Sequence, residues 1–417
     1  MTDNRLPATD DQTMNPREFL KRYKFDKRIV EGSFFPPGPL ELVIGDKVAV
    51  VLFNLGGPGK EKELAPFLYN LFMDPVIIGI PLRGIWRHWL SKFIADKRSK
   101  KIARDYAIMG GGSPITSLTE AQRQALEEQL NEGFGQTNEL EFKVFTAMRY
   151  APPDSEQAAA AMQQFGATKV VLLPLFPHYS KTSSGSSLAY WWMLEQTGEI
   201  PAWPTVSIFE YASHPAYIRA INDRIDEALD DFPADLRSRV QLLFSAHGTP
   251  LVELRKRLDP YCCLIHGSIH EVMAQRGHDL AFHVSFQSKV GRSEWMTPST
   301  VDKVNELAQA GHKALLVQPI SFVTDHIETL VELGVQIREQ DSAAGIEHFQ
   351  VCKGINSHPG FIQALTESVI SHVNLPKARA GIPLWNELSC ADPEKRTLRC
   401  RQCEKTGEPR CWTPGGA

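Results

Sequence analysis

Short apolar runs that contain β-branched residues alternate with helical stretches along most of this chain, and the alternation then begins a second time. One alanine-rich helix is expected from Ser155 to Phe165. Alternating strands and helices are typical of parallel sheets with crossover helices. Strands are expected at residues 48–53, 142–148 and 169–175, and again at residues 204–208, 240–244, 281–286 and 314–318.

A chain of 417 residues is long for one hydrophobic core, so two domains are expected. We predict an α/β fold with two Rossmann-like domains, at residues 48–200 and 201–375, each a parallel sheet flanked by helices. Residues 1–47 form a polar extension that either packs on the surface or stays loose, and residues 376–417 form a cysteine-rich tail. The halves show no obvious internal repeat, so their similarity is expected to be architectural only.

Composition excludes several classes of protein. The net charge is −4, with 45 basic and 49 acidic side chains, which argues against nucleic-acid binding. Charged residues interrupt every apolar stretch before it reaches the length of a membrane span. The N-terminus lacks a signal-peptide core, and its acidic residues argue against a transit peptide. A cytoplasmic location is therefore expected.

A histidine lies just past the end of an expected buried strand, in the turn Ser245–Pro250. Ligands bind at this edge of open α/β sheets. Gly248 and Pro250 favour a tight turn that holds the His247 side chain at the strand tip. A neutral imidazole there can accept protons or bind a metal, although a turn histidine bonded to the backbone is the commoner case.

An acidic segment follows another expected strand. Asp325, Glu328 and Glu332 are spaced to share one face of an α-helix. An apolar stripe of Ile327, Leu330 and Val331 would pack on the sheet, and Gly334 would end the helix. The carboxylates either complement the helix dipole or form a track that leads iron to a reaction centre.

Further motifs accompany these two segments in a fixed order. They lie at residues 52–58, 110–115, 147–150, 179–187, 259–261 and 286–291, followed by Trp295. Together they resemble the ferrochelatase family, which inserts ferrous iron into a porphyrin. The resemblance covers residues 48–373 and implies a chelatase fold that holds the porphyrin in a cleft between the domains. It also implies that His247 and Glu328 are catalytic and contact the substrate iron, with Asp325 and Glu332 along the iron track.

Porphyrin distortion requires apolar walls and a few polar anchors for the propionates. The candidate walls are Leu55, Tyr106, Tyr150, Tyr179 and Trp295. For any one of the tyrosines or the tryptophan, packing in the core is about as good an explanation. The candidate anchors are Arg98, Ser113 and Arg149. Ser113 follows a glycine-rich turn that lacks the ending of a phosphate-binding loop.

The stretch 80–94 mixes large apolar residues with cations. Two interpretations stay open: a core-facing helix with a basic outer side, or an interfacial helix that rests on anionic lipid. The second would add peripheral contact with the inner membrane to a cytoplasmic protein.

Four of the seven cysteines fall in the last 28 residues: Cys390, Cys400, Cys403 and Cys411. Four thiolates flanked by cations suit a metal or a cluster, and tetrahedral zinc and iron–sulfur both fit the Cys-x-x-Cys spacing. The family resemblance favours a [2Fe–2S] cluster. In animal relatives one cluster ligand comes from the Tyr-Ser-x loop, where this chain has Lys181. All four ligands would therefore come from the tail.

Three functions remain open on the sequence. The first is a ferrochelatase that makes protohaem from protoporphyrin IX and ferrous iron. The second is a chelatase of the same fold for coproporphyrin, another tetrapyrrole or another metal. The third is a porphyrin- or haem-binding protein without turnover, against which the presence of both His247 and Glu328 argues. The oligomeric state is not predicted.

Overall fold

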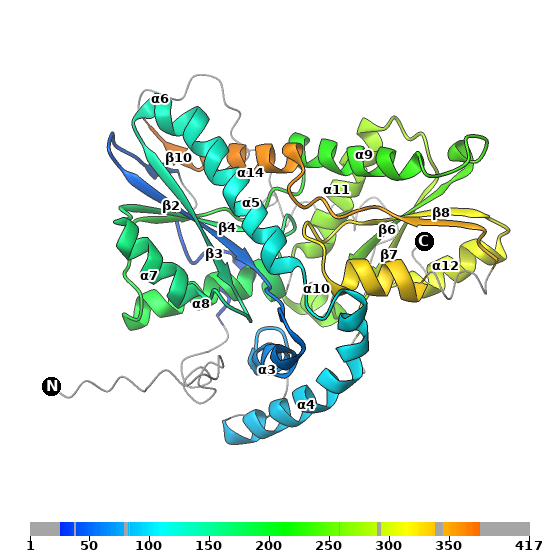
Figure 1. The fold of residues 1–417 in the computed structure, drawn as a ribbon, viewed down its shortest axis with the longest axis horizontal. Coiled ribbons are helices and arrows are strands. Elements are labelled where there is room, and N and C mark those ends of the chain that lie inside the picture. Colours follow the sequence, from blue (N-terminus) through cyan, green and yellow to red (C-terminus); the bar gives the residue numbers. More distant parts are fainter. Residues whose placement is uncertain are drawn as a thin grey trace.

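The computed structural model describes residues 26–36, 39–78, 82, 84–257, 259–289, 293–337 and 345–375. Two α/β halves lie side by side (Figure 1). The first contains a four-stranded parallel sheet in the order β3-β2-β4-β5, and the second contains one in the order β7-β6-β8-β9. The predicted fold class is confirmed.

The first sheet is built from strands whose central members are buried along almost their whole length, as expected when helices cover both faces. Its strands are β2 (Lys47–Asn54), β3 (Glu141–Met148), β4 (Lys169–Pro174) and β5 (Thr205–Ser207). The helices of this half are α2 (Arg28–Glu31), α3 (Leu64–Met73), α4 (Ile85–Ile108), α5 (Ile115–Leu130), α6 (Gln136–Asn138), α7 (Ser155–Phe165) and α8 (Ser186–Thr197). Short 3-10 or π turns are η1 (Glu61–Glu63), η2 (Asn131–Gly135) and η3 (Lys181–Gly185).

The second half repeats this plan. Its strands are β6 (Gln241–His247), β7 (Phe282–Gln287), β8 (Ala314–Pro319) and β9 (His348–Val351). Its helical segments are α9 (Pro215–Leu229), η4 (Arg237–Arg239), α10 (Leu251–Arg257), α11 (Tyr261–Gln275), α12 (Thr300–Gln309), the π-helix η5 (Glu328–Ile337) and α14 (Pro359–Ser371). A separate two-stranded sheet pairs β1 (Leu40–Glu41) with β10 (Val373–Asn374).

The division between the halves differs from the expected one. The strand expected to open the second half is β5, and it pairs with β4 in the first sheet. The last helix, α14, follows the second sheet but packs against α5 of the first half, whereas α9 follows the first sheet and packs against α11 and β8 of the second. The two halves therefore exchange helices: α14 packs on the first half and α9 packs on the second.

These two exchanged helices begin with related sequences, which corrects the expectation of no internal repeat. Residues 213–221 (SHPAYIRAI) and 357–365 (SHPGFIQAL) are identical at five of nine positions. In each, the histidine Nδ1 accepts a hydrogen bond from the backbone two residues later, at 3.2 Å. Each ring also faces a carboxylate of the other helix: His214 Nε2 lies 3.3 Å from Glu367, and His358 Nε2 lies 3.5 Å from Asp223.

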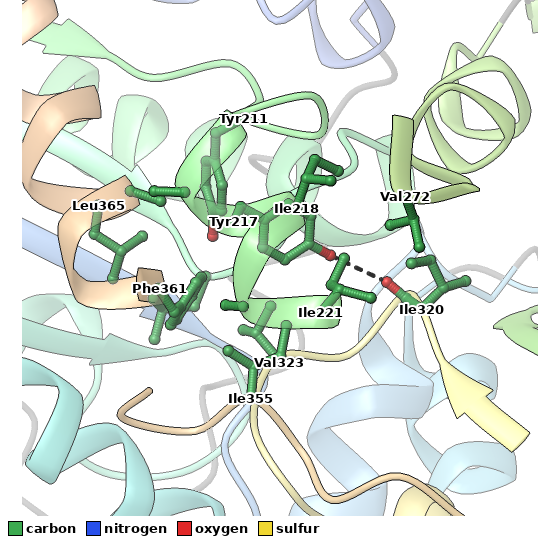
Figure 2. Packing of buried hydrophobic residues seen from close by; sticks show 14 of the residues in the cluster. Tyr211, Tyr217, Ile218, Ile221, Val272, Ile320, Val323, Ile355, Phe361 and Leu365 are labelled. Carbon is green, nitrogen blue, oxygen red and sulfur yellow. Dashed lines mark hydrogen bonds between the residues drawn. The ribbon is translucent and has the colours of Figure 1, made fainter. Parts of the chain in front are cut away.

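The main core runs through both halves, from Val50 of β2 to Phe244 of β6. Figure 2 shows its centre, where α9 and α14 meet the segment after β8. The Tyr217 and Phe361 rings lie 6.2 Å apart, and the Tyr217 hydroxyl donates to the carbonyl of Ile320 at 3.3 Å. One hydrophobic core therefore joins the two halves.

The N-terminal extension packs on the first half over residues 26–36. Ile29 and Val30 are buried, and the Arg28 guanidinium lies 4.1 Å from the centre of the Trp192 ring. The Ile29 carbonyl accepts a hydrogen bond from the Tyr179 hydroxyl. Of the two expectations for the extension, packing on the surface is therefore the correct one for residues 26–36.

Candidate active site

The site lies in the second sheet, at the point where the order of the strands along the chain reverses. β6 pairs with β7 on one side and with β8 on the other, and both chain segments leave the sheet at its carboxyl edge. Such a reversal opens a crevice in which ligands bind. His247 ends β6, and the segment after β8 leads to Glu328. The pairing of β6 with β8 thus brings together two motifs that are far apart in the sequence.

His247 is held from three directions. Its backbone N–H donates to Ser321 Oγ at 2.9 Å, and its carbonyl accepts from the Tyr261 hydroxyl at 3.0 Å. Its ring Nδ1 lies 2.7 Å from the Gly248 carbonyl. Because a carbonyl only accepts, Nδ1 carries the proton, and in the neutral ring Nε2 presents its lone pair. The side chain is 38% exposed, so substrate can reach it.

Glu328 faces this nitrogen. His247 Nε2 and Glu328 Oε2 are 4.0 Å apart, and the same oxygen accepts hydrogen bonds from Ser288 Oγ at 3.0 Å and Gln287 Nε2 at 3.3 Å. Burial raises the pKa of Glu328, but the positive charge that His247 and His326 carry when protonated, together with the two hydrogen bonds, outweighs burial, so the pKa lies below its ordinary value. The group is a carboxylate at neutral pH.

A third titratable residue, His326, was missed by the sequence reasoning. Its Nδ1 lies 3.0 Å from the Thr324 carbonyl, and its ring centre is 4.4 Å from that of Phe322. Burial lowers the pKa of His326, with smaller effects from Glu328 and His247, so the ring is neutral at neutral pH. Its place directly after Asp325 in a polar motif was the available signal.

Aromatic side chains lie close to His247. The ring centre of Trp295 lies 6.4 Å from that of His247, and the ring centre of Phe322 lies 6.2 Å away on an edge-to-face approach. A Cβ at residue 248 would lie 3.2 Å from the Trp295 ring and 3.0 Å from the Gln287 carbonyl, so glycine allows this close packing. Tyr106 comes from α4 of the first half, and its pKa is raised by burial and by the charge of Glu328.

Two other predicted residues lie on loops that meet in the first half. One of these residues is Leu55, and the other is Ser113. The Ser113 backbone N–H donates to the carbonyl of Pro58, three residues after Leu55, at 2.8 Å. A Cβ at residue 112 would lie 2.3 Å from the Gly59 carbonyl oxygen, which explains a glycine there. Both side chains are half-buried. The glycine-rich turn therefore serves a close contact between loops.

Three predicted substrate residues are instead engaged inside the first half. Asp74 Oδ2 accepts hydrogen bonds from Arg149 at 2.9 Å, Tyr150 at 2.7 Å and Ser186 at 2.6 Å. The Tyr179 ring is fully buried and stacks on Phe209 with centroids 4.0 Å apart. The packing explanation accounts for the positions of Arg149, Tyr150 and Tyr179.

Arg98 differs from Arg149 because its side chain is exposed on α4, where the guanidinium lies 5.7 Å from the centre of the Phe72 ring. On the same helix, large apolar side chains face solvent, with Trp86 71%, Trp89 59% and Phe93 65% exposed. The core-facing interpretation of this stretch is therefore wrong for these side chains. Among the described helices, none is both long and apolar enough to cross a bilayer.

The acidic segment is not the α-helix that the sequence suggested. Residues 328–337 form a π-helix, in which hydrogen bonds run from i to i+5, so the expected shared face does not apply. Leu330 is 41% exposed whereas Leu333 is buried, and the helix continues past Gly334. Asp325 lies before the helix, and its carboxylate accepts from Thr329, Gly354 and Asn356 at 2.8–3.2 Å. The Glu332 side chain and the four tail cysteines lie outside the described residues.

The ferrochelatase family model matches residues 47–373, more than three quarters of the chain. The chain belongs to the ferrochelatase family. It is a lyase that inserts a metal ion into a porphyrin. The ferrochelatase of Gloeobacter violaceus is 39% identical over 333 residues, which cover 79% of this chain and 98% of that protein. The ferrochelatase of Geotalea daltonii is 38% identical over 329 residues, covering 79% and 98%.

Among solved structures, SirB from Bacillus subtilis with Fe3+ aligns with 81% of this chain and 100% of that chain, at 11% identity and a TM-score of 0.45. That likeness is too distant to bear on the site. The family match covers residues 47–373, so the packed segment 26–36 lies outside it.

Proposed function

We propose that this ferrochelatase inserts ferrous iron into protoporphyrin IX and releases two pyrrole protons, with His247 and Glu328 as the reacting pair. The observation that carries the proposal is the 4.0 Å approach of His247 Nε2 to Glu328 Oε2 at the carboxyl edge of the second sheet. The unprotonated Nε2 accepts a pyrrole proton, and the carboxylate stabilises the resulting imidazolium and takes the proton onward. His326, neutral and adjacent, is a further proton acceptor.

We propose that Trp295 and Tyr106 bound the macrocycle from opposite halves, with Leu55 beside them and Ser113 as a polar anchor. Arg98 is the better candidate than Arg149 for a propionate, because Arg149 is committed to Asp74 at 2.9 Å and its side chain is 5% exposed. Protoporphyrin carries fewer carboxylates than coproporphyrin and so needs fewer cations. Asp325, with its carboxylate bonded to the Gly354 backbone and to Asn356, shapes the track, for which Glu332 stays a candidate.

One anaerobic assay tests the substrate assignment. Purified protein is mixed with ferrous iron and either protoporphyrin IX or coproporphyrin, and metalloporphyrin formation is followed by absorbance. The higher kcat/KM is expected with protoporphyrin IX. A higher value with coproporphyrin would reassign the substrate, and porphyrin binding without turnover of either would favour a non-catalytic binding protein.

We propose that α4 also makes peripheral contact with an anionic membrane. Trp86, Trp89 and Phe93 recur at helical spacing on its exposed side, and Lys92 and Lys97 lie on the same helix. Exposed aromatic residues beside cations are typical of helices that lie in a lipid interface. The protein is expected to float with vesicles containing anionic lipid, and Trp86→Ser with Trp89→Ser to reduce that fraction. Equal flotation of both proteins would contradict membrane contact through α4.

We propose that Cys390, Cys400, Cys403 and Cys411 hold a [2Fe–2S] cluster, with zinc as the competitor. The donor set fits because thiolates bind such clusters and nearby cations offset the negative charge. Lys181 supplies no cluster ligand, because its ammonium forms a buried ion pair with Glu253 at 2.9 Å. The described halves carry the proposed reaction without the tail, so the cluster would serve stability or sensing.

A further inference from the structure

The loop between β4 and α8 crosses from the first half to the second and ends on one carboxylate. Ser180 Oγ and the Lys181 backbone N–H donate to Asp259 Oδ2 at 3.0 and 2.8 Å. On the other side, the Tyr261 backbone N–H donates to Asp259 Oδ1 at 3.0 Å. Asp259 is 5% exposed. Both oxygens of a buried carboxylate are thus used to join two segments of different halves.

The same contact continues to the reactive histidine. Tyr261 is the first residue of α11, so Asp259 fixes the start of the helix on which the tyrosine stands. The Tyr261 hydroxyl donates to the His247 carbonyl at 3.0 Å, while Ser321 accepts from the His247 N–H at 2.9 Å. Contacts therefore link the Ser180 hydroxyl and the Lys181 backbone N–H through Asp259 to the Tyr261 backbone. The Tyr261 side chain then carries the link to the His247 carbonyl.

The Lys181 ammonium is not the group that binds the Asp259 carboxylate. The Lys181 ammonium pairs with Glu253 at 2.9 Å, and it is the Lys181 backbone that donates to Asp259. An acceptor-only group at the N-terminus of the 15-residue α11 is also favoured by the helix dipole. The carboxylate is therefore placed to set geometry between backbone groups.

We propose that Asp259 is a positioning residue, which orients His247 through Tyr261 and makes that orientation depend on the loop from the first half. This proposal rests on the proposed role of His247. A shift of the His247 peptide moves Nε2 relative to Glu328 and to the bound porphyrin. Because misplacement of a reacting group by about 1 Å costs on the order of a hundredfold in rate, small losses of alignment are measurable.

The test is Asp259→Asn in the full-length protein, with Asp46→Asn as the matched control. An asparagine replaces one acceptor oxygen by an NH₂ group, which faces donors and loses at least one of the three bonds. Asp46 is also buried and accepts from Val43 N and Thr168 Oγ1 at 2.8 and 2.7 Å, but it precedes β2 at the amino edge of the first sheet. Porphyrin fluorescence titration counts binding-competent sites, so kcat is expressed per competent site.

Asp259→Asn is expected to lower kcat on the order of tenfold or more with porphyrin KM within about twofold, whereas Asp46→Asn keeps both. Tyr261→Phe removes the next bond in the path, so its effect and that of Asp259→Asn are expected to be non-additive in the double variant. Fully additive effects, or a normal kcat per competent site, would overturn the proposal. If Asp259→Asn does not fold, Ser180→Ala replaces it in the same cycle.

A second readout does not depend on turnover. The rate at which diethylpyrocarbonate modifies His247, measured by mass spectrometry, is expected to change in Asp259→Asn and Tyr261→Phe but not in Asp46→Asn. An unchanged rate in Asp259→Asn would refute positioning by Asp259. Retained turnover in His247→Ala would instead refute the proposed catalytic role, while the modification rate would still report whether Asp259 positions His247.

Discussion

His247→Ala is expected to abolish nearly all metal insertion while the protein still folds and binds porphyrin. General acid–base groups contribute on the order of 10²- to 10⁴-fold, and the alanine removes the only ring nitrogen that faces Glu328 at 4.0 Å in the described site. The backbone contacts to Ser321 and Tyr261 do not use the side chain, so the strand end is retained. The measurements are anaerobic kcat with ferrous iron and thermal unfolding.

Glu328→Gln provides the companion variant, because it keeps the shape of the side chain and removes its charge. Turnover is expected to fall with little change in porphyrin affinity, since the carboxylate faces His247 rather than a substrate anchor. Its loss should be smaller than that of His247→Ala, because the imidazole still accepts the pyrrole proton. A folded His247→Ala protein with a near-normal rate would remove His247 from the reaction, whatever Glu328→Gln does.

Much of the fold was predictable because parallel strands buried on both faces are continuous apolar runs. Seven of the eight strands in the two large sheets were expected, including β2 and β6. The missed strand, β9, is half-buried along its whole length and reads HFQV, so its pattern is weak. The assignment of β5 to the wrong half had another cause, since a strand's sequence does not say which neighbour it will pair with.

The approach of His247 to Glu328 was predictable from position, whereas the surroundings of these two residues were not. His247 and Glu328 each follow a strong buried strand, and only the pairing of β6 with β8 brings them to one crevice. The contacts of Arg149 and Tyr179 were not predictable, because an arginine or tyrosine that binds a carboxylate or carbonyl in the core looks the same in sequence as one that lines a cleft. The motif at residues 259–261 was noticed in the sequence, but its contact with the loop of the first half could not be predicted, because that contact depends on how the halves meet.

The helix after Asp325 shows why spacing alone misleads. An α-helical spacing rule placed Leu330 on the packed side, but the π-helix exposes it and buries Leu333. Periodicity reports a face only when the hydrogen-bonding pattern is known, and π-helical stretches occur often at functional sites. Glu328 begins this segment, so the departure from α-helix coincides with the proposed chemistry.

Protein purified without oxygen is expected to be red-brown and to contain about two irons and two sulfides per chain, the count set by four-thiolate ligation of a [2Fe–2S] cluster. Replacing any one of the four tail cysteines by serine should bleach it and release both irons, because a serine oxygen is a poor substitute for a thiolate. Iron, sulfide and zinc analysis, with visible absorbance, measure the outcome.

Lys181→Ala is the matched control for the tail. Its position corresponds to a cluster ligand in animal relatives, yet here its ammonium is bound to Glu253, so its loss should weaken the contact between the halves and leave colour and iron content unchanged. Cluster loss in Lys181→Ala would place a ligand near that loop. A colourless protein with one zinc per chain, lost on replacement of any tail cysteine, would refute the iron–sulfur assignment and retain the four-cysteine site, since zinc takes the same thiolate donors.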